Sequence, residues 1–317
     1  MITERRLYML FIVFLIALAV LGPSYWAYDK AFSSRKTKGR DDLDFKFRGQ
    51  MLENKDRIVG LIKDLKERPF EEVETVSFDG MTLRGSFYHQ NDSSPVAICF
   101  HGWNGTARRD FSGGAAILLN AGYNVILVDE RGQGKSDGQV MSFGINERRD
   151  VQSWAEYAFR RFGPERPVFL VGVSMGAAAV LMAADLPLPE SVKGIIADSP
   201  YDSPYEIIEK VAVKDLGLPK ALMFYAKLGA KVFGRFDLED IKASDCLRRS
   251  DLPVLIIHGL ADGFVPAYMS KKAADVRPDI VKRITFEGAE HGMSFIVDPA
   301  RYRRETLDFL SEILDRI

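Results

Sequence analysis

From residue 73 onward, short apolar segments alternate with segments whose apolar residues recur at helical spacing. The short segments are hydrophobic on both faces, which is typical of parallel strands in a sheet covered by helices on both sides. An Asp79-Gly80 turn between two alternating runs also predicts a β-hairpin over residues 73–88. Further strands are expected at residues 96–100, 123–129, 168–173, 192–197, 254–258 and 281–286. The pattern therefore predicts an α/β domain with a mostly parallel twisted sheet over residues 73–317.

The segments between these strands carry the helical pattern. Helices are expected at residues 111–121, 146–162, 175–184, 268–276 and 300–317. The connection between residues 197 and 254 is too long for a plain crossover, and it contains helix-like segments at 205–213 and 221–232. We expect residues 200–247 to form a small, mainly helical cap over the carboxyl ends of the strands.

The N-terminus differs from the rest of the chain. Residues 7–21 are apolar without a charge, and aromatic side chains extend the run to residue 28. That length suits a bilayer-spanning helix with Trp and Tyr at the headgroups. We expect residues 1–28 to be a single membrane anchor. A cleaved signal peptide is one alternative, although bulky residues occupy the expected cleavage site. A buried core helix is the other, and it fits poorly with a run that is apolar all round.

Basic residues flank the apolar run on both sides. Arg5 and Arg6 precede it, as in an export signal, whereas a larger basic group follows it within residues 30–40. The positive-inside rule applied to the second group favours a cytoplasmic domain. The first group favours an extracytoplasmic domain, toward which we lean. Residues 29–72 are expected to be a juxtamembrane linker with an amphipathic helix at 51–66, which packs on the domain or lies on the membrane surface.

Composition excludes several classes of protein. The formal net charge is -1, so no overall electrostatic attraction to nucleic acid is expected. Cys99 and Cys246 are the two cysteines, and neither belongs to a CxxC pair, so a zinc or thioredoxin-like site is not expected. Cys99 lies in an apolar strand and is interpreted as a buried thiol. No metal or organic cofactor is implied, and the oligomeric state is left open.

Ligands of parallel α/β sheets bind beyond the carboxyl ends of the strands, so the residues that follow each strand are the candidates for chemistry. Ser174 follows the expected strand 168–173, inside the sequence Gly-Val-Ser-Met-Gly at 172–176. A G-x-S-x-G turn between a strand and a helix exposes its serine at the top of the sheet. Ser174 is therefore the candidate nucleophile.

Two later strands are followed by candidates for the partners of this serine. Asp262 lies in the loop after residues 254–258, and His291 lies in the loop after residues 281–286. The order Ser, Asp, His along the chain suits a general base at His291 and a carboxylate at Asp262 that orients it. Asp251 and Asp298 are alternatives for the carboxylate, although neither follows a strand closely.

An oxyanion formed at the serine needs two backbone N–H donors. The first is expected to be the N–H of Met175, the residue that follows the nucleophile. The second is expected to be the N–H of Trp103, in the His-Gly-Trp loop that follows residue 100. His101 is interpreted as a brace for that loop.

Residues 129–136 read DERGQGKS, which resembles part of a phosphate-binding loop. That motif needs a glycine at position 129, where this chain has Asp129, and a helix directly after it. The stretch is better interpreted as a glycine-shaped turn in which Asp129 and Arg131 tie loops together.

Together these motifs resemble the α/β-hydrolase superfamily over residues 73–317. Within it they are similar to the serine aminopeptidase and monoglyceride-lipase-like branch and to bacterial membrane-anchored hydrolases. The resemblance implies a serine hydrolase that cleaves an ester through an acyl-enzyme and acts on a small-molecule acyl substrate. The apolar residues of the cap and the membrane anchor make lipid-derived esters a candidate class of substrate. A peptidase, a thioesterase or a haloperoxidase on the same triad is the alternative chemistry, and a membrane-tethered binding protein is the non-enzymatic alternative.

Overall fold

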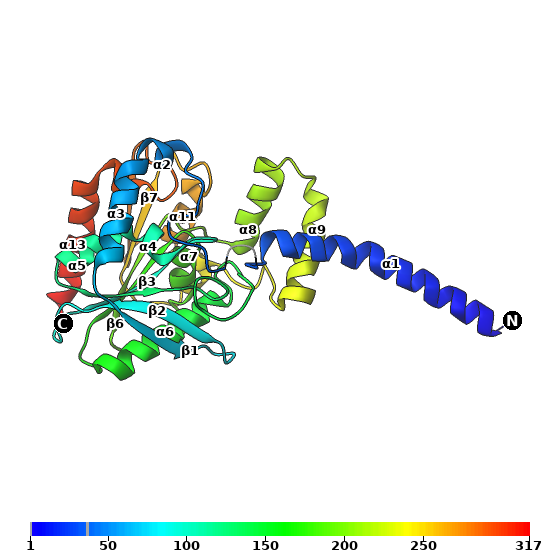
Figure 1. Cartoon of the computed structure of the whole chain (residues 1–317), viewed down its shortest axis with the longest axis horizontal. Helices are drawn as coiled ribbons and strands as arrows, with labels where there is room; N and C mark the ends of the chain where they lie inside the picture. Colours follow the sequence, from blue (N-terminus) through cyan, green and yellow to red (C-terminus); the bar gives the residue numbers. More distant parts are fainter. Residues whose placement is uncertain (1, 36–37) are drawn as a thin grey trace.

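The computed structural model describes residues 2–35 and 38–317, and its centre is a single sheet (Figure 1). The strands lie in the order β1-β2-β4-β3-β5-β6-β7-β8. The pairs β1–β2 and β2–β4 are antiparallel, and the other pairs are parallel. Their bounds are β1 (Glu71–Val76), β2 (Thr82–Tyr88), β3 (Val96–Phe100), β4 (Asn124–Val128), β5 (Val168–Val173), β6 (Val192–Asp198), β7 (Val254–Gly259) and β8 (Val281–Phe286). The hairpin and the mostly parallel sheet are confirmed.

Helices cover both faces of this sheet. They are α4 (Ala107–Asp110), α5 (Ser112–Asn120), α6 (Glu147–Phe162), α7 (Met175–Met182), α10 (Ala243–Leu247), α11 (Ala267–Ala274), α12 (Ser294–Val297) and α13 (Pro299–Leu314). On β3, Ile98 belongs to the buried cluster that contains Trp154 of α6, whereas Cys99 belongs to the cluster of Leu118 on α5 and Leu310 on α13. Both faces of the strand are therefore buried, and Cys99 is a free buried thiol, as expected.

The helix predicted at residues 111–121 differs from the structure at its start. It is divided into α4 and α5, and α4 begins at Ala107. The reason is local, because the Thr106 hydroxyl accepts a hydrogen bond from the Arg109 backbone N–H and so caps a first helical turn.

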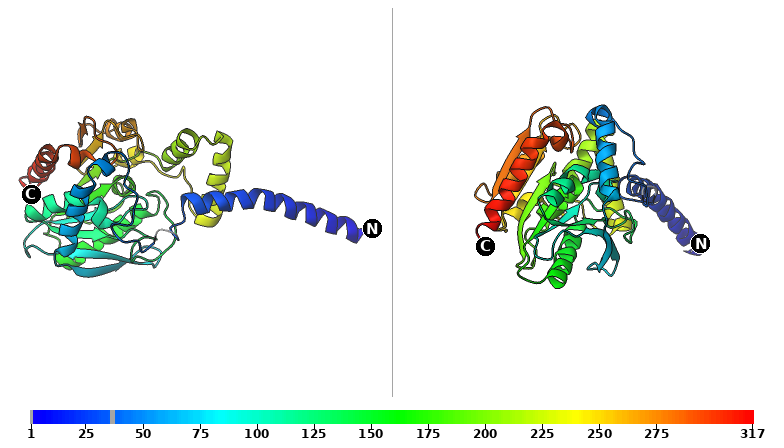
Figure 2. Two further views of the ribbon diagram at one scale, coloured as in Figure 1. Left: turned by 45° about the horizontal axis from the view of Figure 1, so that its top comes forward. Right: turned by 60° about the vertical axis from the view of Figure 1, so that its left-hand side comes forward.

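The segment between β6 and α10 contains short helices that lie apart from the sheet, on the side where α1 approaches (Figures 1 and 2). They are α8 (Pro204–Glu209), the π-helical η1 (Lys210–Asp215), the 3₁₀ turn η2 (Lys220–Leu222), α9 (Met223–Gly229) and the π-helical η3 (Ala230–Gly234). A serine cap starts this segment, since the Ser203 hydroxyl accepts from the Glu206 N–H. We call residues 200–247 the cap.

The N-terminal helix α1 (Ile2–Ala31) extends away from the rest of the molecule (Figures 1 and 2). Nearly all of its apolar stretch is exposed, so the interpretation as a buried core helix is wrong. The helix is long and apolar enough to cross a membrane, and a signal sequence passes the same test. Its last turns pack on α9, where a Cβ at Gly229 would lie only 2.3 Å from the Ser24 carbonyl oxygen. Glycine at this position therefore permits the close approach of the two helices.

The segment after α1 packs on the domain. The helix predicted at 51–66 is present as α2 (Gly49–Glu53) and α3 (Lys55–Glu67), with Asn54 between them. Ile58 and Ile62 of α3 are buried in a small cluster with Met293. The apolar stripe of this segment therefore faces the domain.

Candidate active site

Ser174 lies in the sharp turn between β5 and α7. Its backbone has φ of 55°, in the left-handed region that non-glycine residues rarely adopt. The turn is crowded, since a Cβ at Gly176 would lie 2.0 Å from the Phe100 carbonyl oxygen. Only glycine at position 176 lets α7 pack this closely on the neighbouring strand. The local sequence thus holds the Ser174 side chain at the carboxyl edge of the sheet.

The structure brings His291 and Asp262 to this serine. The His291 Nε2 atom lies 2.9 Å from Ser174 Oγ, and its Nδ1 atom lies 2.6 Å from Asp262 Oδ2. The three side chains come from the loops after β5, β7 and β8. This geometry suits proton transfer from the serine hydroxyl to the imidazole, with the carboxylate holding the ring. The two alternative carboxylates lie elsewhere, because Asp251 pairs with Arg277 and Asp298 caps α13.

Asp262 is held by several donors at once. Its Oδ1 atom accepts from the backbone N–H groups of Phe264, at 2.9 Å, and Val265, at 2.7 Å. The buried His258 ring lies 3.3 Å from Oδ2. Burial by itself would raise the pKa of the Asp262 carboxyl, but the imidazoles of His291 and His258 outweigh it and hold the pKa well below its usual value. Asp262 is therefore an anion throughout the neutral range.

The two expected oxyanion donors flank the serine. Met175 is the first residue of α7, so its N–H is one of those at a helix N-terminus that lack an intrahelical acceptor. Trp103 lines the same cavities as Ser174. Its loop is fixed by Asp110, whose Oδ2 accepts from the Gly102 N–H at 2.8 Å while Oδ1 accepts from Arg109. The sequence does not indicate that Asp110 supports this loop, because Asp110 does not follow a strand.

The His101 side chain supports the same loop through hydrogen bonds to Gly102 and Glu130. Its ring is fully buried, with Nδ1 2.9 Å from the Gly102 carbonyl and Nε2 accepting from the Glu130 N–H. Burial lowers the pKa of His101. A neutral ring is what these contacts need, so His101 acts as a brace.

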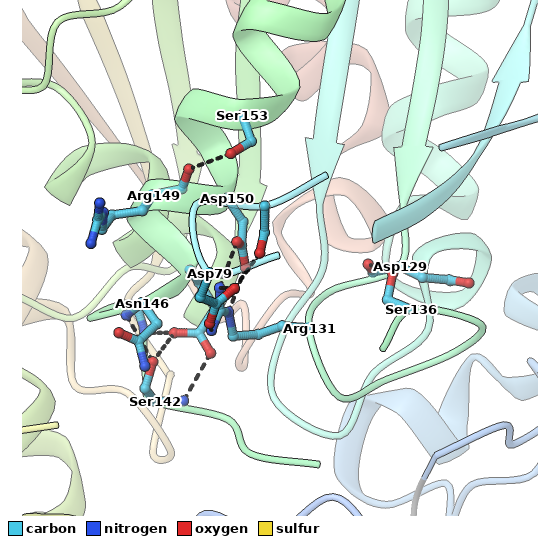
Figure 3. Close-up of polar contacts among 12 residues, drawn as sticks. Asp79, Asp129, Arg131, Ser136, Ser142, Asn146, Arg149, Asp150 and Ser153 are labelled. Carbon is cyan, nitrogen blue, oxygen red and sulfur yellow. Dashed lines mark hydrogen bonds and ion pairs between the residues drawn. The ribbon is translucent and has the colours of Figure 1, made fainter. Parts of the chain in front are cut away.

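The turn at residues 129–136 ties loops together, as its sequence predicts (Figure 3). The Arg131 guanidinium lies between Asp150 and Asp79 and pairs with both, with closest contacts of 2.6 and 3.0 Å. The Asp129 carboxylate accepts from the Lys135 backbone N–H, and its carbonyl accepts from the Ser136 hydroxyl. These groups are occupied with the protein itself rather than arranged around a phosphate.

Beside this network lies a buried carboxyl group with no hydrogen-bond partner among the described residues, that of Glu130. Burial and the nearby carboxylates of Glu147 and Asp150 raise its pKa well above the usual value. Between the unfolded and folded pKa values, the folded chain holds a proton that the unfolded chain releases. The free energy of unfolding therefore falls as pH rises through that interval.

We expect Glu130→Gln to reduce this loss of stability, because the amide mimics the protonated acid. Between about pH 5 and about pH 8, the variant should therefore lose less stability than the wild type, by about 1.4 kcal/mol for each pH unit that lies between the unfolded and folded pKa values of Glu130. Chemical unfolding at both pH values measures the difference, and Glu165→Gln at an exposed position is the control. An equal pH dependence in wild type and Glu130→Gln would show that Glu130 does not titrate with folding.

A further contact ties the juxtamembrane segment to the histidine loop. The Gln50 backbone N–H donates to Glu290 Oε2 at 3.0 Å, and the Gln50 side chain bonds the Gly288 carbonyl and the Glu290 N–H. Glu290 directly precedes His291. No local signal in the sequence indicates this clamp, because its partners are 240 residues apart.

Two cavities meet at Ser174. One, of about 170 Å³, is lined by Arg109 and Asp110 together with apolar residues of α3 and α12. The other, of about 460 Å³, is lined almost entirely by apolar side chains, most of which belong to the cap and α1. A carbonyl carbon placed at Ser174 Oγ would have room on both sides.

Known proteins resemble this chain in sequence and in fold. The family model described as the alpha/beta hydrolase fold matches residues 95–243. The uncharacterized protein YqkD of Bacillus subtilis is 23% identical over 252 residues, which cover 78% of this chain and 82% of that protein. The lysophosphatidylserine lipase ABHD12 of Danio rerio is 29% identical over 193 residues, 58% of this chain but only 47% of the lipase.

Among solved structures, the esterase Pf2001 of Pyrococcus furiosus superimposes with a TM-score of 0.63 at 21% identity. The match covers 79% of this chain and 93% of the esterase. The family match, this superposition and the sheet order agree with one another, and they show that this chain has the α/β-hydrolase fold.

Proposed function

We propose that this chain is a serine hydrolase that cleaves carboxylic esters, with Ser174, His291 and Asp262 as its triad. The observation that carries the proposal is the unbroken chain of contacts from Ser174 Oγ through His291 to Asp262 Oδ2. The similar esterase and lipase add support for ester cleavage.

In the proposed reaction, His291 Nε2 accepts the proton of Ser174 as Oγ bonds the carbonyl carbon. Backbone N–H groups of Trp103 and Met175 stabilise the oxyanion. The tetrahedral intermediate expels the alcohol, which takes the proton from His291 and leaves an acyl group on Ser174. Water, deprotonated by His291, then attacks this acyl group and releases the carboxylic acid. The anionic Asp262 stabilises the imidazolium in both halves.

A fluorophosphonate probe tests the nucleophile directly. We expect it to label Ser174, with the modified peptide identified by mass spectrometry. Absence of labelling in the folded protein would favour a binding protein on this fold. A panel of esters, thioesters and peptide amides then distinguishes the esterase from a thioesterase or a peptidase. We favour esters over peptides because none of the described residues that line the apolar cavity is acidic, so none of them could bind a substrate amine.

Asp110→Ala should lower kcat on a short ester by about tenfold to a hundredfold, because the Gly102–Trp103 loop loses its brace and the oxyanion donor moves. The KM for a short ester should change less than kcat, because both oxygens of the Asp110 carboxylate are engaged by Gly102 and Arg109, although the side chain also lines the smaller cavity. Asp308→Ala on the exposed face of α13 is the control. If kcat stays at the wild-type value, the loop does not depend on Asp110.

We also propose an organisation for the chain. Residues 1–28 form a membrane anchor, 29–72 a linker with a packed amphipathic segment, and 73–317 the catalytic domain with its cap at about 200–247. The catalytic domain is placed outside the cytoplasm, because two arginines precede the apolar run as in an export signal. The motifs shared with the monoglyceride-lipase-like and serine aminopeptidase branch support placing the chain near it.

A further inference from the structure

The larger cavity joins the candidate nucleophile to the N-terminal helix. Ser174 and Met175 line one part of it, and Pro23, Trp26 and Ala27 of α1 line another. Among its described lining residues only Lys30 is charged. Its volume of about 460 Å³ lies within the ~300–1,000 Å³ typical of ligand pockets. A helix expected to serve as a tether therefore forms a wall of the site.

This wall is held in place by packing. The buried Tyr28 ring lies 5.8 Å from the Phe233 ring and is tilted to it by 42°, and Phe32 contacts Phe236 edge-on, with 5.2 Å between the ring centroids. The close approach of Ser24 to Gly229 adds a backbone contact with α9. The end of α1 is thus docked on the cap, and the cavity lies between them.

The position of the cavity relative to the membrane follows from α1. The stretch that is apolar enough to span a bilayer ends at Ala31, and the cavity is lined by its last turns. Trp26, a residue favoured at the headgroup level, is 58% exposed and lines the cavity. The cap adds exposed apolar side chains to the same lining, Leu216 at 65% and Leu222 at 40%. With α1 in a bilayer, the cavity lies at the membrane surface.

The two cavities differ in chemistry on either side of Ser174. The larger one is apolar, whereas the smaller one includes the charged Arg109 and Asp110. An ester at Ser174 would therefore bury an apolar acyl chain on the α1 side and place a polar leaving group on the other side.

From this arrangement we propose that the substrates are amphiphilic esters with one long acyl chain, taken up from the membrane with the chain lying between α1 and the cap. The proposal rests on the serine-hydrolase function and names its substrate class. It also assigns a second role to α1, because the helix both anchors the enzyme and binds the acyl chain.

The first test compares two tryptophan variants of the full chain in phosphatidylcholine vesicles. Ala27→Trp fills the α1 wall of the cavity, and Ala19→Trp makes the same change at an exposed position of the same helix outside it. The readout is the ratio of kcat/KM for p-nitrophenyl laurate to that for p-nitrophenyl butyrate. In the wild type this ratio should exceed one, since each buried methylene contributes up to about fourfold.

We expect Ala27→Trp to lower the ratio by about tenfold, equivalent to about two lost methylene contacts. Ala19→Trp should leave it unchanged. A wild type that prefers butyrate, or the same ratio in both variants, would overturn the proposal while leaving the esterase function intact.

The second test uses the wild-type chain and so does not depend on how a variant folds. A fluorophosphonate with a long alkyl tail ending in a diazirine is incorporated into the vesicles. Ser174 Oγ bonds the phosphorus and fluoride leaves, with the serine proton passing to His291. Illumination then attaches the tail end to its neighbours. Attachment to residues 23–31 or 207–226 supports the proposal, whereas attachment to residues 51–58, beside the smaller cavity, contradicts it. Absence of any bond at Ser174 would instead refute the proposed function, and the acyl-chain proposal with it.

Discussion

Replacing Ser174 by alanine should lower kcat for ester hydrolysis by about 10⁴–10⁶-fold. Ser174 Oγ is the atom that forms the acyl-enzyme, and without it His291 has no hydroxyl to activate. The change removes one oxygen atom and leaves the turn between β5 and α7 otherwise intact, so the fold should persist. Initial rates with p-nitrophenyl butyrate measure the effect.

The matched control is Ser311→Ala, at an exposed position on α13. It should retain wild-type kcat, and both variants should melt close to the wild-type temperature. Undiminished hydrolysis by a folded Ser174→Ala protein would refute the assignment of the nucleophile.

Asp262→Asn should lower kcat by about 10⁴-fold through the tautomer of His291. The oxygen of the new amide can still accept from the Phe264 and Val265 N–H groups. Its NH₂ group then faces His291 Nδ1, which must become an acceptor. The ring proton therefore moves to Nε2, the atom that has to accept the proton of Ser174. A base in this tautomer cannot activate the serine.

The loss should be mainly in kcat, because Asp262 does not line either cavity at Ser174. Asp251→Asn is the control, since Asp251 precedes β7 and is one of the two alternative carboxylates that the sequence offers, and it is exposed and paired with Arg277. Equal kcat values for the two variants would show that Asp262 is not the orienting carboxylate.

Much of the architecture was predictable from local patterns. Strands β3 and β5 begin and end where their apolar runs do, because a strand buried on both faces does not tolerate polar side chains in its interior. The positions of Ser174, Asp262 and His291 followed from one further rule, that loops after parallel strands meet at one edge of the sheet. Their contacts in the structure agree with that expectation, and the two variants above test it.

Other features depended on partners distant in the sequence. The Gln50–Glu290 clamp and the brace of Trp103 by Asp110 leave no periodic signal, because each is a hydrogen bond between loops. The break at Asn54 between α2 and α3 also could not be predicted, because the apolar residues on both sides of it keep helical spacing.

The apolar N-terminal helix shows most clearly the difference between features that local sequence predicts and features that depend on tertiary contacts. Local patterns were enough to predict that residues 7–21 suit a bilayer and that the chain forms a mostly parallel α/β sheet with a serine elbow, because hydrophobic periodicity and turn residues are local properties. The docking of the end of this helix on α9, and its place in the wall of the cavity at Ser174, could be seen only in the folded chain. That contact depends on how side chains about 200 residues apart pack against each other, which no local pattern encodes.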